Sequence, residues 1–153
     1  MSLKTMYESF YTYDEMVAFL RQAQGEHPNL MSLRSLCTTP EGRKVLLAEI
    51  TDASTGAAED KPAYYVQGGL HAAEGAGSTA ALDVIRRLLS DPDAAGLLRK
   101  VTFYIVPRVN PDGMEYALTT RGTIRSRIEV SERKNGLIPK DMDGDGRILS
   151  MRW

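Results

Sequence analysis

The sequence predicts an α/β fold in which helices cover both faces of a mixed β-sheet. Two β-prone runs, at residues 63–69 and 101–107, have the length of strands, and an amphipathic helical pattern at 75–89 separates them. A strand, a helix and a strand in this order predict a parallel pair with a right-handed crossover. The second run is apolar on both faces, so we expect it at the centre of the sheet.

The segment before these runs predicts a helix and then a hairpin. Thr12 and Glu15 have the spacing of a capping box. The helix after this box is expected to bury one stripe of side chains: Met16, Phe19, Leu20 and Ala23. Residues 30–38 and 44–51 are strand-like, and a turn with Pro and Gly at 39–43 joins them. The chain should therefore supply about four strands of the sheet.

The composition is that of an ordinary globular domain. Of the 153 residues, 42% are hydrophobic and 25% charged, which fits a single domain. Nineteen basic residues against twenty acidic ones point to neither nucleic acid nor an anionic membrane surface, and no apolar run reaches the roughly 18 residues of a membrane helix. Cys37 is the only cysteine, so an internal disulfide is excluded, and we expect Cys37 to be a small buried hydrophobic residue.

The strongest candidate site follows the first strand of the parallel pair. Gly68 and Gly69 end that strand, and His71 and Glu74 come next, before the helix. In open α/β sheets ligands collect beyond the carboxyl ends of the strands, which is where this histidine and this carboxylate should lie. An alternative is a hydrogen-bonded pair at a helix start, where the helix dipole favours a glutamate. The second strand leads into a turn at residues 110–113, which could bring polar groups close to His71.

Three motifs resemble the zinc carboxypeptidase family, the metallocarboxypeptidases related to carboxypeptidase A. Gly68-Gly69-Leu70-His71-Ala72-Ala73-Glu74 resembles the family's His-x-x-Glu zinc-ligand motif. Val106-Pro107-Arg108-Val109-Asn110-Pro111-Asp112-Gly113 is similar to its Asn-Pro-Asp-Gly turn, and Arg125 lies where the family has the arginine that polarises the scissile carbonyl. Residues 1–153 are accordingly expected to be the N-terminal portion of a single catalytic domain.

The resemblance implies hydrolysis of peptide or protein substrates with one zinc ion, for which His71 and Glu74 would be two ligands and Arg125 the oxyanion-stabilising cation. The family's third ligand is a downstream histidine and its general base a still later glutamate. No histidine follows His71, and we expect a chain cut before both groups and inactive alone. A sheet with about half of the family's strands would expose an edge, through which we expect a homo-oligomer to form.

One departure from the family leaves alternatives open. An Asn-Arg pair that binds the terminal carboxylate of the substrate is replaced by Asp141-Met142-Asp143-Gly144-Asp145-Gly146-Arg147, in which Arg147 is the candidate. Residues 141–148 also match the first eight positions of an EF-hand calcium loop, although Arg152 stands at position twelve in place of the bidentate acid. The alternatives are therefore a zinc hydrolase of acyl-amino acids, similar to aspartoacylase, and a non-catalytic calcium or binding module that uses Asp141 to Ile148. The cellular compartment stays open.

Overall fold

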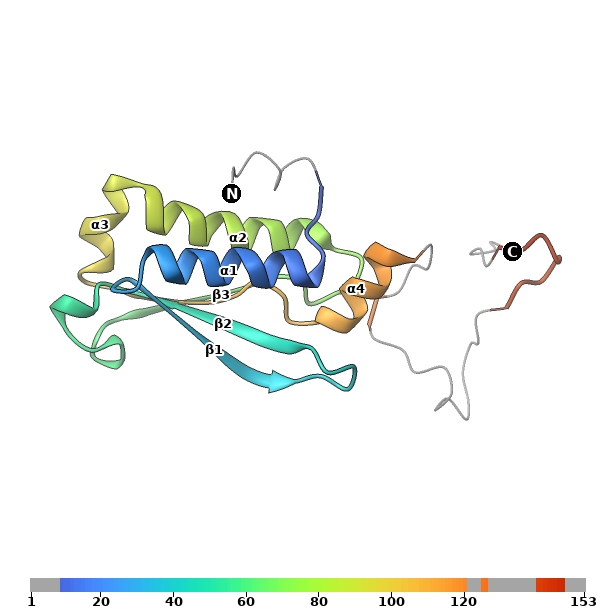
Figure 1. The fold of residues 1–153 in the computed structure, drawn as a ribbon, viewed down its shortest axis with the longest axis horizontal. Coiled ribbons are helices and arrows are strands. Elements are labelled where there is room, and N and C mark those ends of the chain that lie inside the picture. Colours follow the sequence, from blue (N-terminus) through green and yellow to red (C-terminus); the bar gives the residue numbers. More distant parts are fainter. Residues whose placement is uncertain (1–8, 121–124, 127–139, 148–153) are drawn as a thin grey trace.

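The computed structural model describes residues 9–120, 125–126 and 140–147. Four strands form a single sheet in the order β1-β2-β4-β3 (Figure 1). The strands are β1 (Met31–Thr38), β2 (Lys44–Ile50), β3 (Ala63–Gln67) and β4 (Thr102–Val106). The helices are α1 (Tyr13–Glu26), α2 (Gly75–Ser90), α3 (Pro92–Leu98) and α4 (Pro111–Thr119), with short 3-10 turns at Ala53–Thr55 and Ala58–Asp60.

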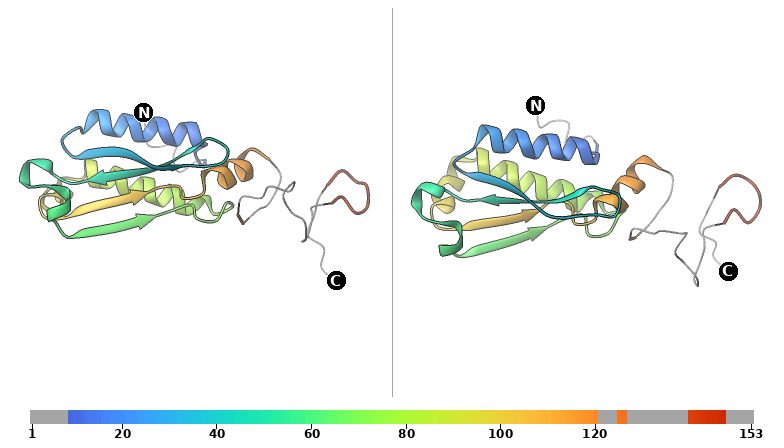
Figure 2. Two further views of the ribbon diagram at one scale, coloured as in Figure 1. Left: turned by 90° about the horizontal axis from the view of Figure 1, so that it is seen from below. Right: turned by 60° about the horizontal axis from the view of Figure 1, so that its bottom comes forward.

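The sheet is mixed, as predicted. β1 and β2 form the antiparallel hairpin, β2 pairs antiparallel with β4, and β3 pairs parallel with β4 (Figure 2). β4 lies between β2 and β3, which confirms the central position expected from its apolar pattern. Because β3 and β4 run parallel, the segments after them leave the sheet at the same end.

The capping box of α1 is present and explains where this helix begins. The Thr12 backbone N–H donates to Glu15 Oε2 at 2.8 Å, and the Glu15 N–H donates to Thr12 Oγ1 at 3.4 Å. The hydrogen bond from the Thr12 backbone holds the pKa of Glu15 below its usual range. Of the predicted stripe, Met16, Leu20 and Ala23 are buried, whereas Phe19 is half-buried and packs at the margin of the core.

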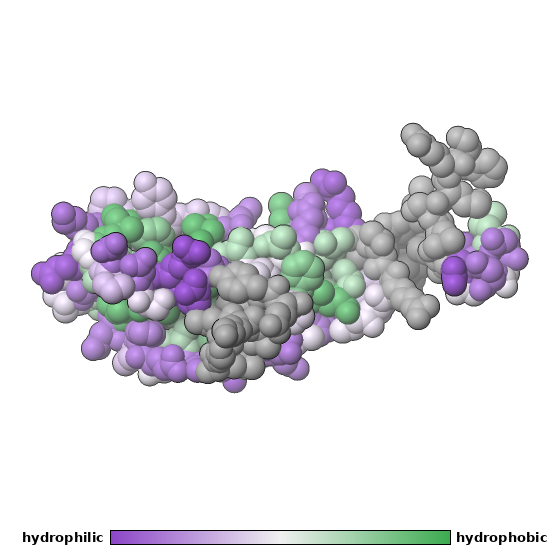
Figure 3. All heavy atoms as spheres, turned by 90° about the horizontal axis from the view of Figure 1, so that it is seen from above, coloured by the Kyte–Doolittle hydropathy of each residue, from purple (hydrophilic) through white to green (hydrophobic). Residues whose placement is uncertain are grey.

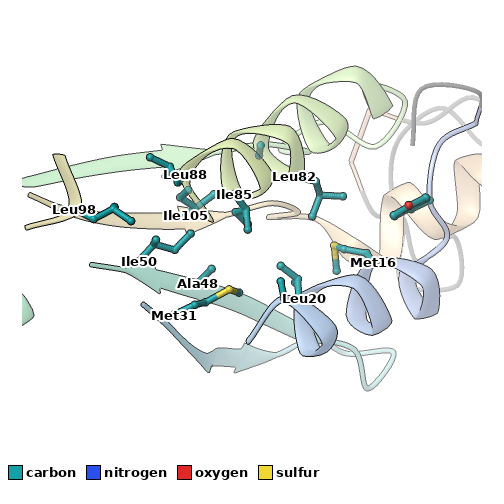
Figure 4. Close-up of a cluster of buried hydrophobic side chains, with 13 residues drawn as sticks. Met16, Leu20, Met31, Ala48, Ile50, Leu82, Ile85, Leu88, Leu98 and Ile105 are labelled. Carbon is teal, nitrogen blue, oxygen red and sulfur yellow. The ribbon is translucent and has the colours of Figure 1, made fainter. Parts of the chain in front are cut away.

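The main core lies between the sheet and a layer of helices. Side chains from α1, α2 and α3 pack on one face of β1, β2 and β4 (Figure 4). A smaller cluster of Val45, Leu47 and Val106 lies on the opposite face. Among the described residues, α1, α2 and α3 all cover the face of the sheet that carries the main core. Helices were expected on both faces, and in this part of the chain these three lie on one.

Cys37 was predicted to be buried, and this prediction is wrong. Its side chain is exposed, because β1 is an edge strand in which every residue from Arg34 to Thr38 is exposed, whichever face of the sheet it points to. A single cysteine carries no sequence signal that its strand lies at the edge of the sheet.

The connection at residues 52–61 is held at the end of the sheet opposite to His71. Lys61 donates from Nζ to Thr51 Oγ1 at 2.9 Å, to the Asp52 carbonyl oxygen at 2.7 Å and to Thr55 Oγ1 at 2.9 Å. These bonds close the loop that leads into β3.

The outer surface on the α2 side intersperses hydrophilic and hydrophobic residues (Figure 3). Across residues 9–120, 125–126 and 140–147, every helix is too short or too polar to cross a membrane.

Candidate metal site

The turn after β3 is joined to the segment after β4 by backbone hydrogen bonds. The Gly68 N–H donates to the Val106 carbonyl at 2.9 Å. In the other direction, the N–H groups of Val109 and Asn110 donate to the carbonyls of Gly68 and Gly69 at 3.0 and 2.9 Å. The ladder thus continues beyond the two strands and holds the start of the His71 turn against residues 106–110.

Two glycines make this close approach possible. Gly69 has a φ of +59°, in the left-handed region that favours glycine. A Cβ atom on Gly68 would lie 2.3 Å from the Gly77 carbonyl oxygen and 3.0 Å from that of Pro107. The turn is therefore packed backbone to backbone between α2 and the segment after β4, which positions the loop that carries His71.

His71 and Glu74 lie together at the start of α2. His71 Nδ1 is 2.9 Å from Glu74 Oε1, and the side chains are 30% and 65% exposed. Glu74 is the N-cap residue of α2, but its side chain makes no capping hydrogen bond to the helix. Both side chains are accessible to solvent, and a ring nitrogen and a carboxylate oxygen, each able to bind a metal ion, lie side by side.

This donor set fits zinc, which binds imidazole nitrogen and carboxylate oxygen at about 2.0–2.2 Å. Two atoms bound to one such ion are separated by no more than about 4.4 Å, and the 2.9 Å between these two atoms satisfies that limit. The same distance also suits the hydrogen-bonded pair considered from the sequence. Within the described residues, no third His, Cys, Asp or Glu joins these two in a potential metal site.

Arg125 lies next to the turn that carries His71. The Ala72 N–H donates to the Arg125 carbonyl oxygen at 2.9 Å, so the backbones of the two predicted site segments are adjacent. Arg125 is exposed. More than fifty residues separate it from His71 in sequence, and this single backbone contact shows how the chain returns to the site.

The Asn110–Gly113 segment was expected to be a turn, but it is the first turn of α4. The Asn110 side chain accepts a hydrogen bond from the Gly113 N–H at 2.9 Å, and Pro111 stands in the first turn of the helix. An asparagine cap before a proline is a helix-start signal in its own right. A Cβ atom on Gly113 would lie 2.9 Å from the Ala72 Cβ, so the start of α4 does pack beside His71, as expected.

Asp112 is a buried charge whose importance the sequence did not reveal. It is 1% exposed, and its carboxylate accepts hydrogen bonds from Thr39 Oγ1 at 2.8 Å, the Glu41 N–H at 3.2 Å and Arg43 Nη1 at 3.0 Å. The carboxylate therefore ties the β1–β2 turn to the start of α4. An aspartate in a polar turn gives no pattern that would predict this burial.

The aspartate-rich loop at residues 140–147, which includes Arg147, lies beyond α4 (Figure 1). Arg147 is exposed, and its N–H donates to Asp145 Oδ1 at 2.8 Å. No contact in the described residues brings it to His71 or Glu74. Carboxylate oxygens of Asp141, Asp143 and Asp145 lie within 4.8 Å of one another, and hydrogen bonds from the Gly146 and Gly144 N–H groups lower the pKa of Asp141. Ile148 and Arg152, which belong to the calcium-loop comparison, lie outside the described residues.

An α/β sheet with a histidine and a glutamate at the carboxyl end of a parallel strand defines a candidate metal-binding α/β protein. The family model for zinc carboxypeptidase matches residues 16–143, and the chain belongs to this family. Carboxypeptidase B from Astacus astacus is 31% identical over 112 residues, which cover 72% of this chain and 36% of that protein. A zinc carboxypeptidase from Saccharothrix mutabilis subsp. capreolus is 29% identical over 124 residues, or 78% of this chain and 28% of that one.

Solved structures of the same kind share the fold. The carboxypeptidase A structure from Helicoverpa armigera superposes with a TM-score of 0.72 at 26% identity, over 80% of this chain and 30% of that one. Bovine thrombin-activatable fibrinolysis inhibitor, in complex with tick carboxypeptidase inhibitor, gives a TM-score of 0.71 at 20% identity, over 86% of this chain and 41% of that one. The chain thus spans about a third of the length of these relatives.

Proposed function

We propose that residues 1–153 are the N-terminal portion of the single catalytic domain of a zinc-dependent metallocarboxypeptidase that hydrolyses peptide or protein substrates. The observation that carries the proposal is the pair of donor atoms, His71 Nδ1 and Glu74 Oε1, 2.9 Å apart on the turn after β3. Family membership supports zinc as the ion. The solved complex of a relative with a protein inhibitor supports a peptide or protein as the molecule bound.

In this proposal each residue has a defined task. His71 and Glu74 hold the metal, which when bound would supply an activated water and polarise the scissile carbonyl. Arg125 provides positive charge where the oxyanion develops, and its backbone contact with Ala72 supports a position beside the site. Arg147 would bind the terminal carboxylate of the substrate, a role that rests on the resemblance alone.

The third zinc ligand and the general base are assigned to residues outside this chain. No histidine follows His71 in the sequence, and His27 lies in the loop that ends α1, where its backbone N–H caps the helix. With two protein ligands and no base, the 153-residue chain should hydrolyse no peptide by itself.

The first test is a calorimetric zinc titration of the 153-residue chain beside His71→Ala and Glu74→Ala. We expect weak binding or none, because catalytic zinc sites use three protein ligands. Tight stoichiometric binding that either substitution abolishes would contradict the missing third ligand.

In a longer protein that contains these residues, His71→Ala should abolish zinc-dependent release of a C-terminal residue. Hydrolysis of N-acyl amino acids instead would favour the aspartoacylase-like alternative. Stabilisation by calcium that His71→Ala leaves unchanged would favour the non-catalytic module.

The free edge of β3 supports the proposed homo-oligomer. Among the described strands β3 pairs only with β4, and its Tyr64 and Tyr65 side chains are 62% and 60% exposed. An edge strand of this kind can pair with a second copy, and a charge on it opposes such pairing. We expect dimers of the 153-residue chain in light scattering after size exclusion at high concentration. Tyr65→Lys should shift them to monomers, and Leu36→Lys on the other edge strand should not. A chain that is monomeric throughout would rule out the oligomer.

A further inference from the structure

Arg108 is a buried cation that the proposed chemistry does not use. It is 2% exposed and lies two residues beyond the end of β4. Its Nη2 donates to the Tyr11 carbonyl at 2.7 Å and its Nε to Ser78 Oγ at 3.3 Å. Among the described residues, its Nη1 is buried without a hydrogen-bond partner.

This arrangement does not favour stability. Burial lowers the pKa of Arg108 to about 10, against the attraction of Glu115 and Glu15, because the guanidinium loses its water. Both of the acceptors named above are neutral oxygens. An apolar side chain of similar volume commonly serves a core at least as well as a buried charge. A guanidinium here calls for a reason other than core packing.

The position of Arg108 supplies that reason. A Cβ atom on Gly69 would lie 3.3 Å from the Arg108 Cα and Cγ atoms, so the side chain passes directly beneath the turn that leads to His71. Ser78, which accepts from Nε, lies one helical turn after Glu74 on α2. The Tyr11 carbonyl anchors the far side of the guanidinium to the segment that enters α1.

The turn is therefore fixed at both ends by one residue. Its start rests on the backbone and stem of Arg108, and its end, at the first turn of α2, is hydrogen-bonded to the guanidinium of the same side chain. A Cβ atom on Gly75 would lie 2.8 Å from the Phe10 ring, so the segment bound through Tyr11 also covers the residue next to Glu74.

We propose that Arg108 is the positioning residue of the His71–Glu74 loop: it clamps the β3–α2 turn and the first turn of α2 to the Tyr11 segment, and so fixes the separation of the two ligand side chains. This inference rests on the proposed zinc site for its purpose. The clamp itself consists of the contacts of Arg108 with Ser78 and Tyr11, and it can be tested without metal.

Amide hydrogen exchange measured by NMR on the 153-residue chain tests the clamp. Arg108→Met should accelerate exchange of the Val109, Asn110 and Ala72 amides, which close the loop, on the order of tenfold relative to the amides of the sheet. Arg108→Lys, which can keep one acceptor, should restore part of the protection. Lys61→Met removes a comparable set of hydrogen bonds at the other end of the sheet, and it should leave the ratio of loop to sheet exchange unchanged.

If Arg108 only stabilises the fold as a whole, Arg108→Met should accelerate exchange of the loop and sheet amides together, through global unfolding. That result would overturn the proposal. If Arg108→Met does not fold, Ser78→Ala decides, because it keeps the guanidinium but removes the acceptor on α2. Selective opening of the loop supports the clamp, and unchanged exchange contradicts it. In a longer protein that contains these residues, zinc-induced shifts of the His71 ring form a separate arm, in which Arg108→Met should weaken zinc affinity about tenfold. Absence of such shifts in the unsubstituted longer protein would count against the zinc site alone.

Discussion

Asp112→Ala is expected to lower the free energy of unfolding by about 3–5 kcal/mol, because it leaves three part-buried donors without this acceptor. The carboxylate is 1% exposed and is bound by a hydroxyl, a backbone N–H and the Arg43 guanidinium. Removing it breaks these three contacts between the β1–β2 turn and the start of α4. Urea unfolding at neutral pH, followed by circular dichroism, measures the loss.

Two further substitutions make this prediction specific. Asp112→Asn keeps an oxygen for the donors but loses the charge, so it should cost less than the alanine variant. Glu41→Ala removes the second carboxylate on Arg43, at 2.6 Å, but its side chain is 43% exposed. That loss should lie within about 0–1 kcal/mol, as for surface ion pairs. Equal losses for Asp112→Ala and Glu41→Ala would show that burial of Asp112 does not determine its contribution.

Gly68→Ala is expected to destabilise the chain by about 3 kcal/mol, although it adds a single methyl group. The new Cβ would meet three backbone atoms: the Gly77 carbonyl oxygen at 2.3 Å, the Gly77 carbonyl carbon at 2.7 Å and the Pro107 carbonyl oxygen at 3.0 Å. Backbone cannot rotate away as a flexible side chain can. Either α2 or the segment after β4 must move, and the loop of His71 must move with it.

Gly96→Ala is the matched control, since it makes the same chemical change in α3. Nothing lies within 4 Å of a Cβ at Gly96, and alanine is the better helix former by about 0.5–1 kcal/mol. This variant should therefore be slightly more stable than the original chain in the same urea experiment. A Gly68→Ala chain that unfolds at the original urea concentration would contradict the close approach of the turn to α2.

Local patterns in the sequence were enough for most of the secondary structure. The capping box at Thr12 and the stripe after it predicted α1, and the alternation of strand-like and helical runs predicted β3, α2 and a central β4. These signals succeed because burial repeats with the period of the helix or strand itself. The hairpin of β1 and β2 was equally local, since its turn residues stand between its strands.

The start of α4 is a place where local sequence patterns did not predict the structure, because a turn was expected and a helix is present. Asn110 and Pro111 fit a turn and a helix start equally well, and residues 114–119 after them have weak periodicity. Packing of Gly113 against Ala72 and burial of Met114 under Gly69 favour the helix. The exposure of Cys37 is a similar case, because it depends on the position of β1 at the edge of the sheet.

By itself, the sequence determined the order of strands and helices, the pairing type of β3 with β4, and the presence of His71 and Glu74 on one turn. Only the tertiary structure decided that Arg108 and Asp112 are buried and what they bind. Their partners Tyr11 and Thr39 lie 97 and 73 residues away. A charged residue has the same sequence signature whether solvent or a distant carbonyl solvates it, since periodicity reports apolar burial alone. Whether a charged residue contacts solvent or a distant polar group depends on how the segments around the sheet pack together.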